Sequence, residues 1–196
     1  MAPAALVFDL DGTLWDSRIF YAKAISLVSG DFNGAMECLT RGVPVARLLR
    51  EEGIAAPGFR KFVAQAKDEL CLYASVQDVL SAQKDKSVPM GIVTSLPGWI
   101  AIPMLESSNL SQFFATVVGW NRCRIAKPSP RPILLALDDM RVSPSKNVWY
   151  VGDSVVDSQA ARAASISFAW ASYGYSHDTY IEADLTLKSF DEVLAL

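Results

Sequence analysis

The chain has 196 residues, the length of one domain or of a domain with a modest insertion. Hydrophobic residues make up 51% of it and charged residues 20%, which supplies a buried core and argues against disorder. With a formal net charge of -3 and scattered lysines and arginines, the sequence lacks the basic surface that nucleic acid or an anionic membrane would require.

The cysteine and histidine content narrows the possible chemistry. Cys38, Cys71 and Cys123 are odd in number and far apart, which is typical of a reducing compartment, and we expect them as buried thiols. The single histidine, His177, stands in a polar stretch and is expected in an exposed loop. Triads and zinc sites that need histidine are therefore poorly supplied, which leaves carboxylates, hydroxyls and lysine as the candidate catalytic groups.

The N-terminal segment before Asp9 has too short an apolar run and too little positive charge for a signal peptide. No stretch approaches the roughly 20 apolar residues of a membrane span. The sequence therefore predicts a cytoplasmic protein without membrane or nucleic-acid partners, and we expect a monomer.

Short apolar runs have the pattern of strands buried on both faces of a parallel sheet. They cover residues 5–8, 90–93, 115–118, 148–151 and 167–170. Helical patterns between the later runs cover residues 99–107, 132–140 and 154–164. This alternation predicts an α/β fold with a doubly wound, Rossmann-like parallel sheet and right-handed crossovers.

The stretch between the first two runs breaks this alternation. Residues 16–75 contain apolar residues at helical spacing and no clear strand, with a break near residues 56–58. The expected helices cover residues 21–29, 32–39, 45–51 and 59–72. A simple crossover needs one helix, so we interpret 16–75 as an inserted helical cap on a core formed by 1–15 and 76–196.

Polar and reactive residues follow three of the predicted strands. Ligands of open parallel sheets bind beyond the carboxyl ends of the strands, so we expect these residues to meet at one rim. They are Asp9 and Asp11 after the first run, Thr94 and Ser95 after the second, and Asp153 and Asp157 after the fourth.

The carboxylates at this rim point to a metal. Asp9, Asp11 and Asp153 would repel one another unless a cation neutralised them, and Mg²⁺ prefers such oxygen ligands. Asp9 and Asp11 could instead belong to an ordinary Asp-Gly turn, although a charge at the end of an apolar strand would be costly. Asp157 has two open interpretations. It could support the metal site from behind its ligands, or it could only cap a helix, because with Ser154 it has the form of a helix capping box.

Thr94 and Ser95 precede Pro97 and a predicted helix, which makes them either ordinary N-capping residues or an anion site, two roles that are compatible. Lys127 stands in a loop stiffened by prolines. A surface lysine is the simplest interpretation, but this loop could direct the ammonium group toward a phosphoryl group at the rim.

Taken in order, these segments resemble the four motifs of the haloacid dehalogenase-like hydrolases. The matching positions are residues 8–14 (Phe-Asp-Leu-Asp-Gly-Thr-Leu), Thr94, the 127–128 Lys-Pro pair, and 152–153 with Asp157. The helical insertion directly after the first motif resembles the cap of the phosphoglycolate phosphatase-like branch. This resemblance implies a phosphatase that acts on a small phosphorylated metabolite.

The resemblance also implies roles for the motif residues. Asp9 would attack phosphorus and form an aspartyl-phosphate, while Asp11 would act as general acid and then as general base. Thr94 and the Ser95 amide would hold phosphate oxygens, and Lys127 would offset the negative charge.

The same resemblance implies Mg²⁺ as the cofactor. The carboxylates of Asp9 and Asp153 and the backbone carbonyl of Asp11 would bind the ion, with Asp157 supporting them from behind. In the predicted cap, Arg41 and its neighbouring glycine resemble a substrate-specificity loop, so Arg41 is a candidate substrate-binding residue. An ordinary surface arginine is the alternative interpretation.

The chain departs from the family pattern in two places. Ser165 stands where relatives commonly have a glycine at the end of the last helix, so the turn there is expected to differ. The segment 95–97 (Ser-Leu-Pro) lacks the asparagine that often follows the threonine, which could alter substrate contacts.

Four other functions are compatible with some of these residues. A dehalogenase lacks the second acid, so Asp11 argues against it, whereas a phosphomutase of the β-phosphoglucomutase type keeps both acids. A phosphoacceptor receiver module uses similar residues but phosphorylates an aspartate on a middle strand, without a helical insertion after the first. The complete residue set disfavours a catalytically silent binding protein.

Overall fold

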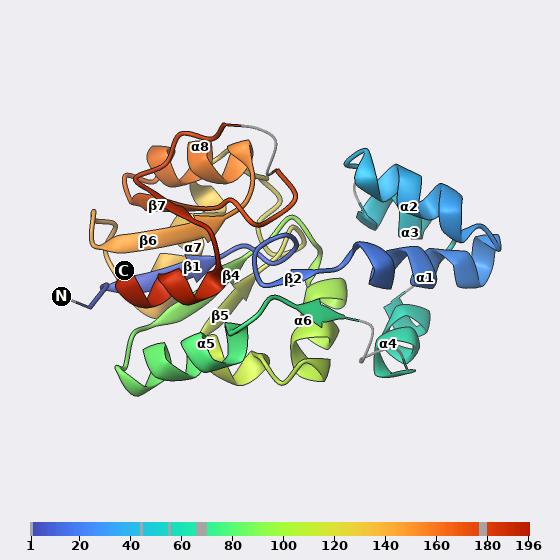
Figure 1. The fold of residues 1–196 in the computed structure, drawn as a ribbon, viewed down its shortest axis with the longest axis horizontal. Helices are drawn as coiled ribbons and strands as arrows, with labels where there is room; N and C mark the ends of the chain where they lie inside the picture. The colour runs from blue at the N-terminus through green and yellow to red at the C-terminus, as the bar shows by residue number, and fades with distance from the viewer. Residues whose placement is uncertain (1, 44, 55, 66–69, 177–179) are drawn as a thin grey trace.

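The computed structural model describes residues 2–43, 45–54, 56–65, 70–176 and 180–196. At its centre is a six-stranded parallel sheet with the strand order β5-β4-β1-β6-β7-β8 (Figure 1). The strands are β1 Ala5–Phe8, β4 Met90–Val93, β5 Thr116–Val118, β6 Val148–Gly152, β7 Ser167–Ala171 and β8 Leu185–Leu187. The predicted α/β fold with a doubly wound parallel sheet is confirmed.

Both faces of the sheet are covered, because successive side chains of a strand point to opposite sides. On β1, Leu6 and Phe8 belong to one apolar cluster, and Ala5 and Val7 belong to another. The first cluster includes residues of α5 (Val76–Asp85), α6 (Gly98–Ser107) and the 3-10 helix Phe190–Ala195. The second includes residues of α7 (Arg131–Met140) and α8 (Val155–Ala163). Burial on both faces explains why the strands are continuous apolar runs in the sequence.

The predicted set lacks α5 and β8 of the α/β part. α5 carries Val76, Val79 and Leu80 on its buried face, a helical spacing that is readable from the sequence. β8 has three residues at the edge of the sheet, and two of them are exposed. A strand of this length is too short to show a pattern.

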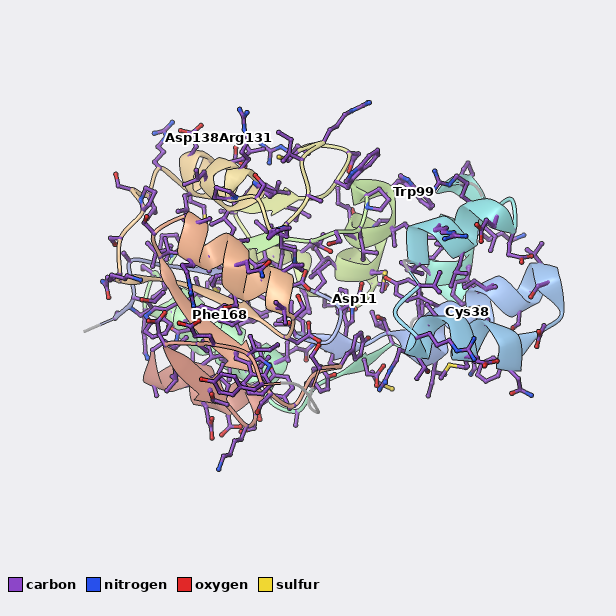
Figure 2. The ribbon with its side chains drawn as sticks, turned by 90° about the horizontal axis from the view of Figure 1, so that it is seen from above. Asp11, Cys38, Trp99, Arg131, Asp138 and Phe168 are labelled. Atoms are coloured by element: carbon purple, nitrogen blue, oxygen red, sulfur yellow. The ribbon has the colours of Figure 1, made fainter. Side chains whose placement is uncertain are left out.

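Four helices lie to one side of the sheet, beyond the end of β1 (Figure 1). They are α1 Arg18–Ser29, α2 Phe32–Thr40, α3 Val45–Glu51 and α4 Ala56–Gln65. Phe59 of α4 makes edge-to-face contacts with Phe20 of α1 and Trp99 of α6, with ring centroids 6.2 and 5.8 Å apart. Figure 2 shows Trp99 where α6 meets these helices. Aromatic packing therefore joins them to the α/β part of the chain.

Two predictions about this segment are wrong. β3 (Cys71–Leu72) pairs antiparallel with β2 (Trp15–Asp16), where we expected a helix over 59–72 and no strand. α4 starts inside the expected break, at Ala56. Pro57 is compatible with this start, because in a first helical turn it lacks only an N–H that would have no partner there. The two short strands lie where the chain leaves and rejoins the α/β part. The division into core and cap stays a prediction.

The remaining expectations have mixed outcomes. Cys71 is exposed, and Cys38 and Cys123 are half-buried, so the expectation of buried thiols is wrong. His177 lies outside the described residues. In the described ranges no helix is long and apolar enough to cross a bilayer.

Candidate active site

The first polar loop begins where β1 ends. The Asp9 N–H donates to the carbonyl of Val151 at 2.9 Å, which extends the β1–β6 pairing by one residue. The chain then turns at Gly12, whose φ of 79° lies in the region that favours glycine. A Cβ atom there would lie 2.3 Å from Oδ2 of Asp153, so glycine also allows this loop to approach the end of β6.

Three buried carboxylates gather at the ends of β1 and β6. Asp9, Asp153 and Asp157 each offer an oxygen, and these oxygens lie within 4.8 Å of one another. The Lys127 ammonium lies 3.0 Å from Oδ1 of Asp9 and 2.6 Å from Oδ1 of Asp157. The rim expected from the sequence is therefore present, but one lysine cannot balance three carboxylates.

The pKa values reflect this excess of negative charge. Burial raises the pKa of Asp9 to about 8, although the charge of Lys127 opposes the rise. Burial and the charge of Asp157 raise the pKa of Asp153 to about 7. Burial alone would lower the pKa of Lys127, but the charges of Asp157 and Asp9 hold it well above its usual value. Lys127 is thus a cation at neutral pH, and ionising all the carboxylates needs further positive charge.

Tyr150 of β6 positions the lysine. Its hydroxyl accepts a hydrogen bond from the Lys127 ammonium at 3.1 Å and donates to the carbonyl of Val93 at 2.9 Å. This role could not be predicted from the sequence, because Tyr150 lies within an apolar run and looks like an ordinary core residue.

Asp157 caps α8 and also pairs with Lys127, while its support of a metal stays a prediction. Its Oδ2 accepts from the Ser154 N–H at 3.0 Å, which completes the capping box of α8. Its Oδ1 pairs with Lys127. Helix capping therefore fixes the orientation of a carboxylate that belongs to the charged cluster.

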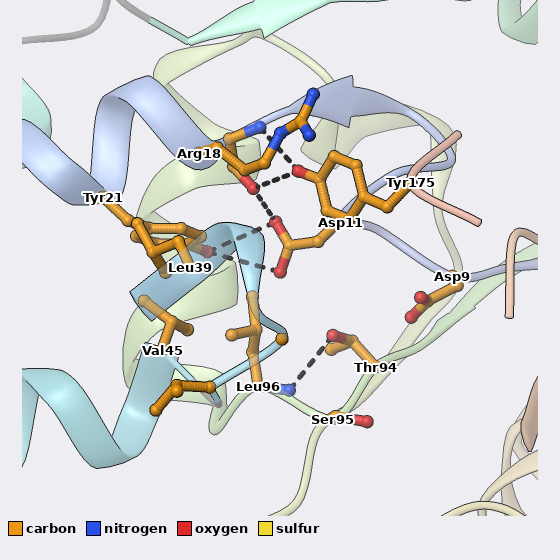
Figure 3. Close-up of a pocket in the computed structure, with 13 residues that line it drawn as sticks. Asp9, Asp11, Arg18, Tyr21, Leu39, Val45, Thr94, Ser95, Leu96 and Tyr175 are labelled. Atoms are coloured by element: carbon orange, nitrogen blue, oxygen red, sulfur yellow. Dashed lines mark hydrogen bonds between the residues drawn. The ribbon is translucent and has the colours of Figure 1, made fainter. Parts of the chain in front are cut away.

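A pocket of about 210 Å³ opens beside the cluster, and Asp9, Asp11, Thr94 and Ser95 all line it. Figure 3 shows Asp9, Thr94 and Ser95 along one wall, with Asp11 opposite. Thr94 Oγ1 accepts from the Leu96 N–H at 3.1 Å. Within the described ranges the Ser95 N–H has no acceptor. An amide without a partner at this position can donate to an anion.

Asp11 belongs to a different hydrogen-bond network from Asp9. Its Oδ1 accepts from the Trp15 indole N–H at 2.9 Å and from the Ser17 hydroxyl, and Tyr21 lies farther away at 3.4 Å. Burial raises the pKa of Asp11, while the hydrogen bonds from Ser17 and Trp15 oppose this rise. A carboxyl group that keeps its proton nearer neutral pH can act as a general acid.

Several pocket residues were not predicted from the sequence. Ser17, Arg18, Tyr21 and Tyr175 also line the pocket. Arg18 forms an ion pair with Asp16 at 2.6 Å and lies over the ring of Tyr175, 4.7 Å from its centroid. Tyr175 follows the carboxyl end of β7, so extending the rim argument to that strand would have indicated it.

The two remaining sequence-based expectations concern Arg41 and Ser165. The Arg41 guanidinium is exposed and pairs with Glu37 at 2.5 Å, whereas the adjacent Gly42 and Val43 line the pocket. A role for Arg41 in substrate binding stays a prediction. Ser165 adopts a φ of 60°, the left-handed conformation that glycine favours at a helix end, so the turn forms without glycine.

A sequence model of the haloacid dehalogenase-like hydrolases matches residues 6–171. The chain belongs to this family. A phosphoglycolate phosphatase of Pectobacterium atrosepticum is 31% identical, over 97% of this chain and 91% of the relative. That of Escherichia coli K12 is 29% identical, over 96% and 90%.

A solved HAD phosphatase from Thermococcus onnurineus has the same fold, with a TM-score of 0.74 at 19% identity, covering 98% of this chain and 96% of that one. The haloacid dehalogenase-like chain described here therefore falls in the phosphoglycolate phosphatase-like branch, and the predicted enzyme class, a phosphatase, is confirmed.

Proposed function

We propose that this chain is a Mg²⁺-dependent phosphatase that hydrolyses a small phosphomonoester through a phosphorylated Asp9. The main support is the position of Asp9, which lies between a buried lysine at 3.0 Å and a pocket that also contains Asp11. A carboxylate placed in this way can reach a phosphoryl group while the lysine offsets the negative charge on both.

The donor set fits a hard divalent cation. Asp9, Asp153 and Asp157 supply only carboxylate oxygens, and together with Lys127 they leave an excess of negative charge in a buried region. Asp9 and Asp153 would bind the ion with the Asp11 carbonyl, and Asp157 would support them through Lys127. When bound, Mg²⁺ supplies positive charge that offsets these carboxylates and attracts the phosphate oxygens of the substrate.

The proposed reaction has two steps, formation and hydrolysis of a phosphorylated Asp9. A carboxylate oxygen of Asp9 bonds to phosphorus as the bond to the leaving oxygen breaks, and Asp11 gives its proton to that oxygen. Asp11 next takes a proton from a water molecule, whose oxygen attacks phosphorus and releases phosphate from Asp9. Thr94 and the Ser95 N–H hold the phosphate oxygens in both steps.

Residues 16–75 are proposed to form a cap over a core made of 1–15 and 76–196. Leu39 and Val45 from α2 and α3 line the same pocket as Asp9 and Thr94, so a substrate there would contact both parts. Closing such a cap would exclude water until the second step.

The substrate proposed for the first test is 2-phosphoglycolate, because curated relatives are phosphoglycolate phosphatases. We expect purified protein to hydrolyse 2-phosphoglycolate and p-nitrophenyl phosphate with Mg²⁺ and to stop when a chelator is added. Asp9→Asn should abolish turnover, whereas Asp85→Asn, at an exposed position on α5, should leave it intact. Full turnover in Asp9→Asn would exclude the nucleophile role. Conversion of glucose 1-phosphate without net phosphate release would indicate a mutase.

A further inference from the structure

The hydroxyl of Tyr175 contacts both hydrogen-bonding groups of Ser17. It accepts from the Ser17 backbone N–H at 2.9 Å and lies 3.0 Å from the Ser17 hydroxyl oxygen. The Ser17 hydroxyl in turn donates to Oδ1 of Asp11. Tyr175 comes from the loop after β7, so this chain of contacts joins Asp11 to a distant part of the sequence.

The Ser17 hydroxyl donates its hydrogen to Asp11, which leaves its oxygen free to accept the hydrogen of the Tyr175 hydroxyl. The Asp16 carboxylate is a second acceptor within reach of that hydroxyl. When Tyr175 donates to Ser17, the contact keeps the serine hydroxyl directed at Asp11.

The two oxygens of Asp11 are left with different surroundings. Oδ1 accepts from Ser17 and from the Trp15 indole at 2.9 Å. Within the described ranges, Oδ2 has one hydrogen-bond partner, the Tyr21 hydroxyl at 3.5 Å, and that hydroxyl also lies 3.2 Å from the sulfur of Met104. Figure 3 shows the Asp11 carboxylate between Tyr175 and Tyr21 at the pocket wall. Oδ2 is therefore the oxygen available to a bound molecule.

Tyr175 is itself held firmly. The Arg18 guanidinium lies over its ring, and its N–H donates to Oδ2 of Asp153 at 2.9 Å. Gly174 allows the loop to come this close, since a Cβ atom there would lie 2.2 Å from the carbonyl oxygen of Gly12.

We propose that Tyr175 is a positioning residue that, through Ser17, holds Oδ1 of Asp11 as an acceptor and leaves Oδ2 to exchange the proton with the leaving oxygen. This inference rests on the proposed function, in which Asp11 is the general acid. As the bond between phosphorus and the leaving oxygen breaks, its electron pair stays on that oxygen, and Oδ2 supplies the proton.

The test uses leaving groups that differ in their need for a proton. Alkyl phosphates such as 2-phosphoglycolate release a basic alkoxide, whereas 2,4-dinitrophenyl phosphate releases a stable phenolate. General acid catalysis contributes about 10²–10⁴-fold. With the Mg²⁺-loaded enzyme, Tyr175→Phe should therefore lower kcat/KM for 2-phosphoglycolate by about 10–100-fold and for the dinitrophenyl ester by less than about 3-fold.

Matched variants separate the possible outcomes. Tyr173→Phe removes a neighbouring hydroxyl that donates to the Thr13 carbonyl at 2.9 Å, and it should leave the ratio of the two kcat/KM values unchanged. Ser17→Ala breaks the same relay and should reproduce the Tyr175→Phe pattern. If Tyr175→Phe does not fold, Ser17→Ala by itself tests whether this relay positions Asp11.

Asp11→Asn distinguishes failure of this inference from failure of the proposed function. In one outcome, Asp11→Asn slows hydrolysis of 2-phosphoglycolate much more than that of the dinitrophenyl ester, while the Tyr175 and Ser17 variants slow both equally. The positioning role is then wrong, and the acid role of Asp11 stands. If Asp11→Asn shows no such selectivity, both the acid role and the inference are wrong.

Discussion

Adding Mg²⁺ or a chelator at different pH values tests the electrostatics of the carboxylate cluster. Without metal, burial holds the pKa of Asp9 at about 8 and that of Asp153 at about 7, against an ordinary value of 3.8. Metal ligands must be ionised, so at about pH 6 binding displaces a proton from each carboxyl group. That pH is two units below the first pKa and one below the second. Apparent Mg²⁺ affinity there should be about 1000-fold weaker than well above pH 8, or about 4 kcal/mol.

The same pKa values fix the sign of the stability change. Both groups have folded-state pKa values above their unfolded ones, so the metal-free folded state binds more protons than the unfolded state between about pH 4 and about pH 8. The free energy of unfolding should therefore fall as pH rises through this window. Stabilisation by Mg²⁺ should grow over the same window, because fewer protons must then be displaced.

Calorimetric titration with Mg²⁺ in two buffers of different ionisation enthalpy measures the affinity and the number of protons released. We expect close to two protons released per ion near pH 6 and almost none well above pH 8. The stability change is measured separately, as Tm in chelator and in excess Mg²⁺. Asp153→Asn should release one proton fewer. Affinity that changes by less than about tenfold over this range, or binding without proton release near pH 6, would refute the assigned electrostatics.

Two further substitutions probe the neighbours of the cluster. Lys127→Met leaves buried carboxylates unpaired and should lower the free energy of unfolding in chelator by about 3–5 kcal/mol, measured in urea, whereas Lys86→Met at an exposed position should not. Gly174→Ala forces a Cβ atom to within 2.2 Å of the Gly12 carbonyl oxygen, and we expect a loss of about 1–3 kcal/mol in thermal unfolding. Gly58→Ala, with open space around it, is the control, and equal stability of the two alanine variants would contradict the close approach.

Much of the fold was predictable because the strands are buried on both faces. β1 and β4 match the expected ranges to the residue, and each buried run stops at a polar residue, Asp9 or Thr94, that marks its carboxyl end. The errors fall where tertiary contacts decide the structure. Cys71–Leu72 is a strand only because Trp15–Asp16 lies beside it, and a two-residue pairing leaves no periodic pattern.

The site was predictable where charge is costly. A carboxylate directly after a buried strand is costly unless it is paired or binds a cation, so Asp9 and Asp153 were identifiable from their positions. Tyr150 has no comparable signal, because a tyrosine is compatible with a core whether or not its hydroxyl makes a functional contact. For Tyr175 the one signal is its position after the carboxyl end of β7. Their roles depend on distances to Lys127 and Ser17 that a linear sequence does not contain.

The loop after β7 contributes a fourth strand end to the site. The sequence suggested three strand ends, but Tyr175 of a fourth donates its backbone N–H to Asp153, and its hydroxyl accepts from the N–H of Ser17. The Ser17 hydroxyl in turn donates to Asp11. One residue thus connects the carboxylate cluster to the proposed acid. Because Gly174 fixes how closely this loop approaches, a shift of the loop would disturb the cluster and the acid together. The leaving-group experiment and the Mg²⁺ titration should consequently show correlated effects in Gly174→Ala and separate effects in Tyr175→Phe, which keeps the backbone contact.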